Sequence, residues 1–229
     1  ILELIHLVNS WGRSNKIIIF QSNKQIVIDN CEAKECHDLS RLDVSQVDNM
    51  NDLFMYSNFY NFHSLNGNII NNSDISNWDV SGVTSMDSMF YRAEKFNSDI
   101  GNWNVSKVTS MTRLFNGAKI FNQDISKWDV SNVNSFSNMF NGTQNFNQNL
   151  NSWNVSNVTN MDGMFLCALE FNQPIYNWDV SNVTNMSRMF YCAENFNQDL
   201  DNWDVLNVIN MDFMFYGSKK FNSDIGNWN

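Results

Sequence analysis

Two sets of aspartate and asparagine residues recur every 25 residues, and their oxygen atoms are the chemistry that the chain offers most regularly. The first set comprises Asp79, Asn104, Asp129, Asn154, Asp179 and Asp204. The second comprises Asp74, Asp99, Asp124, Asn149, Asp199 and Asp224, with Pro174 at the same position of one repeat. Carboxylates from neighbouring repeats could bridge a calcium ion, which prefers oxygen ligands. Aspartate and asparagine also accept hydrogen bonds from backbone amides two residues on, so the sequence favours ordinary turns and predicts no metal and no cofactor.

The residues typical of catalysis do not form a recognisable constellation. The histidines His6, His37 and His63 all precede the regular repeats, and no order of serine, histidine and aspartate supports a catalytic triad. Cys31 and Cys36, next to His37, lack the second ligand pair that a structural zinc site needs. An active site is an asymmetric cluster, whereas most of this chain is internally repetitive. We therefore expect a protein that is not an enzyme.

Two further cysteines, Cys167 and Cys192, are one repeat apart and should lie next to each other in adjacent units. The corresponding residues of other repeats are Gly117, Gly142 and Gly217. One interpretation is that the cysteines are small, half-buried side chains. The other is that they form a disulfide between neighbouring units, and the sequence leaves both open.

Tryptophan shows the repeat that positions these residues. Its period of 25 residues, without slippage, is seen in Trp78, Trp103, Trp128, Trp153, Trp178, Trp203 and Trp228. Two phenylalanine rows keep the same register: Phe90, Phe115, Phe140, Phe165, Phe190 and Phe215, then Phe96, Phe121, Phe146, Phe171, Phe196 and Phe221. Internal repetition at a period of about 20–50 residues is typical of stacked coils, in which each unit buries its apolar face against its neighbours.

The pattern within one repeat predicts a strand and a helix. Residues 75–80 follow the L-x-x-L-x-L spacing of a leucine-rich-repeat strand, and residues 85–94 carry apolar side chains at the i, i+3, i+4, i+7 spacing of a helix. Thr84 or Ser85 would cap that helix. We therefore predict an α/β repeat fold: a leucine-rich-repeat-like, right-handed solenoid with one short strand and one short helix per 25-residue coil. Asn77, Asp79 and Ser81 would then line its concave sheet face.

Two regions depart from the repeat. Residues 1–37 predict an N-terminal cap, with a helix over the apolar stripe from Leu2 to Trp11 and short strands at 17–20 and 25–28. Residues 38–229 predict about seven to eight repeats. In the first of these Leu42 replaces the tryptophan, and 11 extra residues lie within 55–72. A surface loop tolerates such an insertion.

Composition excludes two classes of partner. The formal net charge of −10 argues against nucleic acid, because phosphate-backbone binding normally requires a basic surface. No apolar run approaches 18 residues, so we expect no membrane span. Asparagine is very abundant, and its side chains supply turns and can stack as hydrogen-bonded ladders between coils.

The run from Phe171 to Phe190, and that from Phe121 to Phe140, resembles the BspA-type repeat family, also catalogued as a domain of unknown function with 25-residue units. The resemblance extends over about residues 39–229. Leu42, Phe136, Pro174, Leu206 and Ile209 depart from its pattern. The resemblance implies a role in adhesion or protein–protein contact, a cell-surface or secreted location, and no catalytic motif.

These observations predict a non-catalytic interaction or adhesion module. It would bind a protein or a host-surface ligand through the polar, acidic strand face, with the first aspartate and asparagine set as its binding residues. The alternative is a structural spacer or a component of a larger assembly. A minor third interpretation is ice binding by a threonine row, Thr84, Thr109, Thr159 and Thr184, although Asn134 and Ile209 interrupt that row. The sequence does not predict an oligomeric state.

Overall fold

The computed structural model describes residues 17–21, 24–28, 43–56, 62–63, 69–70 and 75–228. Strands β1 (Ile17–Gln21) and β2 (Lys24–Ile28) pair antiparallel, with Ile19 opposite Ile26. Both lie where the sequence predicted short strands, while the helix predicted before them lies outside the described residues. Strands β3 (Phe62–His63) and β4 (Ile69–Ile70) form a second antiparallel pair within the segment assigned to the insertion.

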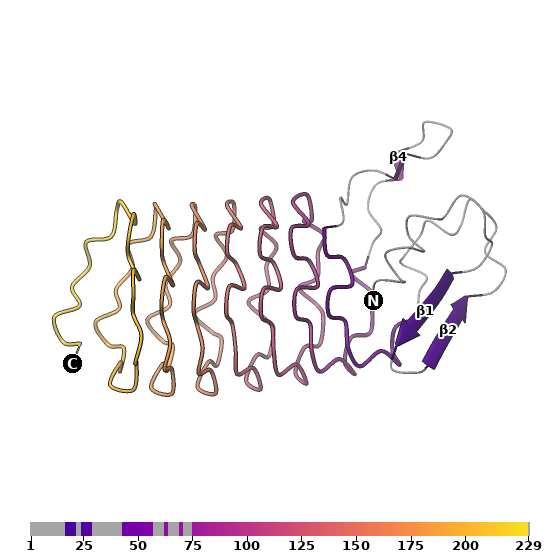
Figure 1. The fold of residues 1–229 in the computed structure, drawn as a ribbon, viewed down its shortest axis with the longest axis horizontal. Helices are drawn as coiled ribbons and strands as arrows, with labels where there is room; N and C mark the ends of the chain where they lie inside the picture. The colour runs from indigo at the N-terminus through magenta and orange to yellow at the C-terminus, as the bar shows by residue number, and fades with distance from the viewer. Residues whose placement is uncertain are drawn as a thin grey trace.

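The repeats form coils stacked side by side along the long axis of the molecule (Figure 1). Seven coils within the described residues are joined by parallel bridges at Asn49, Ser85, Ser110, Ser135, Asn160, Asn185 and Asn210. The first bridge joins residues 36 positions apart, whereas each later bridge joins residues 25 apart. One 25-residue repeat of the sequence therefore forms one complete coil.

The predicted strand and helix of each coil are absent, so the leucine-rich-repeat-like α/β fold was wrong. Within residues 43–56 and 75–228 no residue is helical, and the only β-structure consists of isolated bridges. The segment read as a strand closes a turn instead, in which the amide of Trp78 donates to the carbonyl of Ile75 at 3.1 Å. The coils consist of successive turns.

The division of backbone amides between two tasks explains why no helix forms. Alternate amides donate to the next coil, as from Ser88 to Thr112 (2.9 Å) and from Phe90 to Leu114 (2.9 Å). The amides between them close turns within the coil, as from Tyr91 to Ser88 (3.0 Å). An α-helix instead requires each amide to bond four residues back. The apolar side chains of residues 86–93 are buried as predicted, but turns and not a helix direct them into the core.

Two positions in each coil have left-handed backbone. One row comprises Ser88, Arg113, Asn138, Gly163, Arg188 and Phe213, and the other Arg92, Gly117, Gly142, Cys167, Cys192 and Gly217. Each lies third in a four-residue turn, as Ser88 does between Met86 and Met89. A positive φ at this place defines a type II turn. These turns aim the alternate amides at the next coil.

Aromatic side chains fill the inside of the stack. Within one coil the rings of Phe115 and Phe121 stack at 4.0 Å, and between coils Phe115 and Phe140 stack at 5.7 Å. The buried indole of Trp153 donates from Nε1 to the carbonyl of Ile125 in the preceding coil at 3.1 Å. Buried polar atoms are costly without a partner. The tryptophan row therefore fills the core and satisfies its own buried indole N–H groups, each of which adds a second donor to a carbonyl that also closes a turn.

Candidate functional site

We use the name acidic row for the first set of predicted binding residues: Asp79, Asn104, Asp129, Asn154, Asp179 and Asp204. Each side chain is exposed, although its two neighbours in the chain are buried. Trp128 and Val130, for example, are only 3% and 1% exposed on either side of Asp129. The stack brings the six residues into one row on the surface. They lie on turns, not on the concave face of a sheet as predicted.

Hydrogen bonding in the acidic row confirms the turn interpretation. Oδ1 of Asp129 accepts from the amide of Ser131 at 3.1 Å and from its hydroxyl at 2.6 Å. Asn154 accepts the same two bonds from Ser156, at 3.1 and 2.8 Å. Asparagine and aspartate are therefore interchangeable for the turn. They differ only in the charge that they present to solvent.

Three aspartates of the acidic row, Asp79, Asp129 and Asp179, have a lowered pKa. Hydrogen bonds from the serine two residues on lower the pKa of Asp79, Asp129 and Asp179. The charge of Asp43, in the coil before Asp79, acts in the opposite direction on the pKa of Asp79. Neutral asparagines at 104 and 154 separate the charges along the middle of the row, where like charges in contact would repel.

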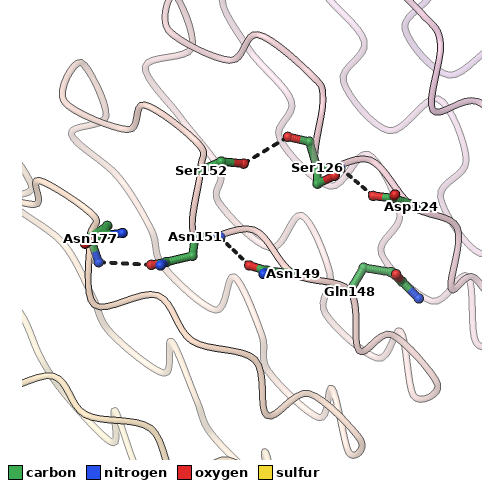
Figure 2. Close-up of a pocket in the computed structure, with 7 residues that line it drawn as sticks. All are labelled: Asp124, Ser126, Gln148, Asn149, Asn151, Ser152 and Asn177. Carbon is green, nitrogen blue, oxygen red and sulfur yellow. Dashed lines mark hydrogen bonds between the residues drawn. The ribbon is translucent and has the colours of Figure 1, made fainter.

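The second aspartate and asparagine set also forms turns, and it borders a corner pocket of about 410 Å³ (Figure 2). The lining residues are Asp124, Ser126, Gln148, Asn149, Asn151, Ser152 and Asn177. Figure 2 shows the chain of contacts between them, in which Ser152 donates to the carbonyl of Ser126 at 3.1 Å. The amide of Asn177 donates to Oδ1 of Asn151 at 3.0 Å.

The corner pocket offers mainly hydrogen-bonding groups. Asp124 is its only ionisable side chain, and hydrogen bonds from Ser126 lower the pKa of that carboxyl. It is therefore charged at neutral pH and cannot serve as a general acid. The other lining groups are amides and hydroxyls. The sequence does not predict this pocket, because its lining comes from three successive coils.

No metal centre is apparent in the part of the chain that the structure describes, where no three His, Cys, Asp or Glu side chains could hold one ion. His6 lies outside that part, as do Cys31, Cys36 and His37. His63 belongs to β3. The corner pocket and the acidic row are therefore the two candidate binding sites.

Asparagine forms ladders between coils, as the sequence suggested, and its side-chain oxygens accept from main-chain amides and from glutamine side chains of the next coil. Oδ1 of Asn122 accepts from the amide of Asn147 at 2.9 Å and from Nε2 of Gln148 at 2.9 Å. The same asparagine row comprises Asn97, Asn122, Asn147, Asn172, Asn197 and Asn222. The recurring Phe-Asn-Gln triplet was the signal for it.

Threonine has a different task from the predicted helix cap. The described coils contain no helix for threonine to cap. Instead, the hydroxyl of Thr109 donates to the carbonyl of Thr84 at 3.2 Å, and the hydroxyl of Thr184 donates to the carbonyl of Thr159 at 3.1 Å. The row thus joins neighbouring coils. Its exposed side chains remain the basis of the ice-binding prediction.

The architecture defines a tandem-repeat protein of stacked 25-residue coils. The chain belongs to the family described as Mycoplasma protein of unknown function, DUF285, whose model matches residues 22–133, 55–168 and 149–229. The narrower resemblance to BspA-type repeats is not confirmed by that match. No curated protein and no solved structure matches the chain. Within the described residues, no helix has the length and apolar character needed to cross a bilayer.

Proposed function

We propose that the chain is a non-catalytic interaction module that binds a macromolecular partner through the acidic row. The observation that carries the proposal is the row itself, because an exposed aspartate or asparagine is presented in each of six successive coils. Membership of a repeat family supports a modular role. Repeat proteins use extended surfaces of this kind for partners, since each coil adds an equivalent contact. The partner would present basic or hydrogen-bond-donating groups at a matching interval.

Only one oxygen of each carboxylate is committed to the turn. Asp129 and Asp179 use Oδ1 for the serine two residues on, and no hydrogen bond in the described structure involves Oδ2 of either residue. A partner can therefore bind Oδ2 without breaking the turn. Such contacts are individually weak at an exposed surface, but several in one row act together.

The test exploits the fact that asparagine already replaces aspartate in this row. The double variant D129N/D179N keeps the turn and removes two charges, so the fold should be unaffected. We expect binding to a cell-surface extract or a glycan and protein array to fall at least tenfold. The control D99N/D199N removes the same charge from turns outside the acidic row, where Asp99 and Asp199 accept from amides two residues on at 3.0 Å. Equal losses in both variants would contradict the proposal.

The alternative is a structural component of a larger assembly, and residues in the coil from 201 to 225 favour it. Leu206 and Ile209 are 74% and 86% exposed, although their rows contain serine and threonine or asparagine elsewhere. Exposed apolar groups of this kind often mark contact surfaces. If L206S/I209T abolishes association with a partner and D129N/D179N does not, the assembly role is supported instead.

A further inference from the structure

Cys167 and Cys192 occupy a row of the stack whose backbone favours glycine. The row comprises Tyr56, Arg92, Gly117, Gly142, Cys167, Cys192 and Gly217, and every member has a positive φ. A left-handed backbone is disfavoured for residues that carry a Cβ. Backbone preference therefore does not explain why cysteine occupies this position in two neighbouring coils.

The main chain fixes the two cysteines in register. The amide of Cys167 donates to the carbonyl of Tyr191 at 2.7 Å, and the amide of Cys192 to that of Tyr216 at 2.7 Å. Hydrogen-bonded neighbouring chains lie roughly 4.8 Å apart. This spacing falls within the roughly 4.4–6.8 Å between Cα atoms that a disulfide spans.

Side chains in this row lean back over the preceding coil. A Cβ placed on Gly217 would lie 3.6 Å from Cα and 2.8 Å from Sγ of Cys192. A Cβ on Gly117 would lie 3.4 Å from Cα of Arg92. Cys192 has the same place one coil earlier than Gly217, so its side chain leans over Cys167. Burial and then the neighbouring Cys192 thiol raise the pKa of the Cys167 thiol.

We propose that Cys167 and Cys192 are a redox-active pair that forms a disulfide between adjacent coils on reaction with a small-molecule disulfide such as oxidised glutathione. One protein thiolate attacks the small disulfide and releases one small thiol. The second protein thiolate then attacks the mixed disulfide and releases the other. Two protein thiols are oxidised to one disulfide, and one small disulfide is reduced to two thiols. The inference is independent of the proposed partner.

The surroundings permit and control this reaction. Both thiols are free and only half-buried, so a small disulfide can reach them. The nearby charge of Glu194 also raises the pKa of Cys167, which disfavours its thiolate. The thiolate is the reacting form, so the reaction should accelerate as the pH rises. Once formed, the bond ties together two coils that otherwise separate when the stack opens locally.

The full chain carrying C31S and C36S isolates the pair. We expect incubation in oxidised glutathione to remove two hydrogen atoms from the intact mass, with peptide mapping that joins residues 167 and 192. The Tm should rise by about 5–10 °C, because the bond closes a loop of intermediate length. Glutathione adducts on both cysteines without an internal bond, or unchanged free thiols, would overturn the proposal.

A pair of register variants provides the control. In the same background, G142C/C192G leaves two cysteines in adjacent coils of the same row, whereas G142C/C167G leaves them two coils apart. We expect the first to close an internal disulfide as the native pair does, and the second to remain reduced. Bonding at equal rates in both variants would show that register does not govern the reaction, and would overturn the proposal.

Discussion

The two sides of each coil are joined to their neighbours by different chemistry. On the backbone side, residues 84–95 and their equivalents at 25-residue steps, main-chain amides donate to main-chain carbonyls of adjacent coils. On the side-chain side, residues 97–107 and their equivalents, the backbone bonds of the described coils close turns only. There the coils are joined by asparagine, glutamine and tryptophan side chains, as in the bond from Trp128 to Ile100 at 3.0 Å.

This difference explains where the repeat varies. One outward position of the backbone side is Ser88, Arg113, Asn138, Gly163, Arg188 and Phe213 in successive coils. A main-chain bond does not depend on the side chain, so this position varies even though its positive φ favours glycine. The asparagine row that begins at Asn97 and the tryptophan row do not vary, because the side chain itself makes the bond. Among the polar and indole side chains, constancy therefore accompanies bonds between coils, whereas the constant phenylalanine rows fill the core.

The largest expected effect comes from breaking a main-chain bond on the backbone side. Arg113 has a φ of 58°, and its amide donates to the carbonyl of Ser137 at 2.9 Å. R113P removes the donor and forbids this φ, so we expect urea unfolding to show a loss of more than about 3 kcal/mol. R113G keeps the donor and relieves the left-handed strain, and should change stability by less than about 1 kcal/mol. Similar losses in both variants would contradict the comparison.

A smaller loss should follow removal of a tryptophan donor on the side-chain side. W153F leaves the buried carbonyl of Ile125 without its indole partner and reduces the buried volume. We expect a loss of about 2–4 kcal/mol in urea unfolding, because a lost buried hydrogen bond and the cavity left by the smaller ring both destabilise. M161L, a volume-conserving change at a fully buried position of the same coil, should cost less than about 1.5 kcal/mol.

The asparagine row tests the same side at a more exposed position. Oδ1 of Asn147 accepts from the amide of Asn172 at 3.0 Å and from Nε2 of Gln173 at 3.1 Å. N147A removes both bonds and should lower the unfolding free energy by about 1–2 kcal/mol. Asn145 is exposed, and only its main-chain amide bonds to the preceding coil. N145A should therefore change stability by less than about 0.5 kcal/mol.

The sequence predicted the core better than the backbone that surrounds it. Met86, Met89, Phe90 and Ala93 were predicted to face inward, and all four are fully buried. Their spacing was read as a helix because successive turns place the same positions inward. Glycine at 117, 142, 163 and 217, within the equivalent segments, was the missed signal. Glycine is unfavourable inside a helix but favoured where φ is positive.

The sequence predicted which residues form the acidic row, but it did not predict that they lie on turns. Burial of Trp128 and Val130 on either side of Asp129 follows from the alternation in the sequence. That alternation does not distinguish a strand from a turn, because both place neighbouring side chains on opposite faces. Ser131, two residues after Asp129, was the local indication of a turn. The corner pocket depends on how three coils meet and has no comparable local pattern.

The smallest expected effect separates charge from turn geometry within the acidic row. Serine hydrogen bonds lower the pKa of Asp129 and Asp179 in the folded state, so the stability they confer is present above the unfolded pKa of about 3.9. It is lost as the pH falls through the lower folded value. S131A/S181A should therefore destabilise the protein at pH 6, and the difference from wild type should shrink below about pH 4. S156A removes the matching bond to uncharged Asn154, at 2.8 Å, and its smaller effect should not change with pH. An S131A/S181A effect that does not change with pH, and that per serine equals the S156A effect, would show that the turn and not the charge governs the row.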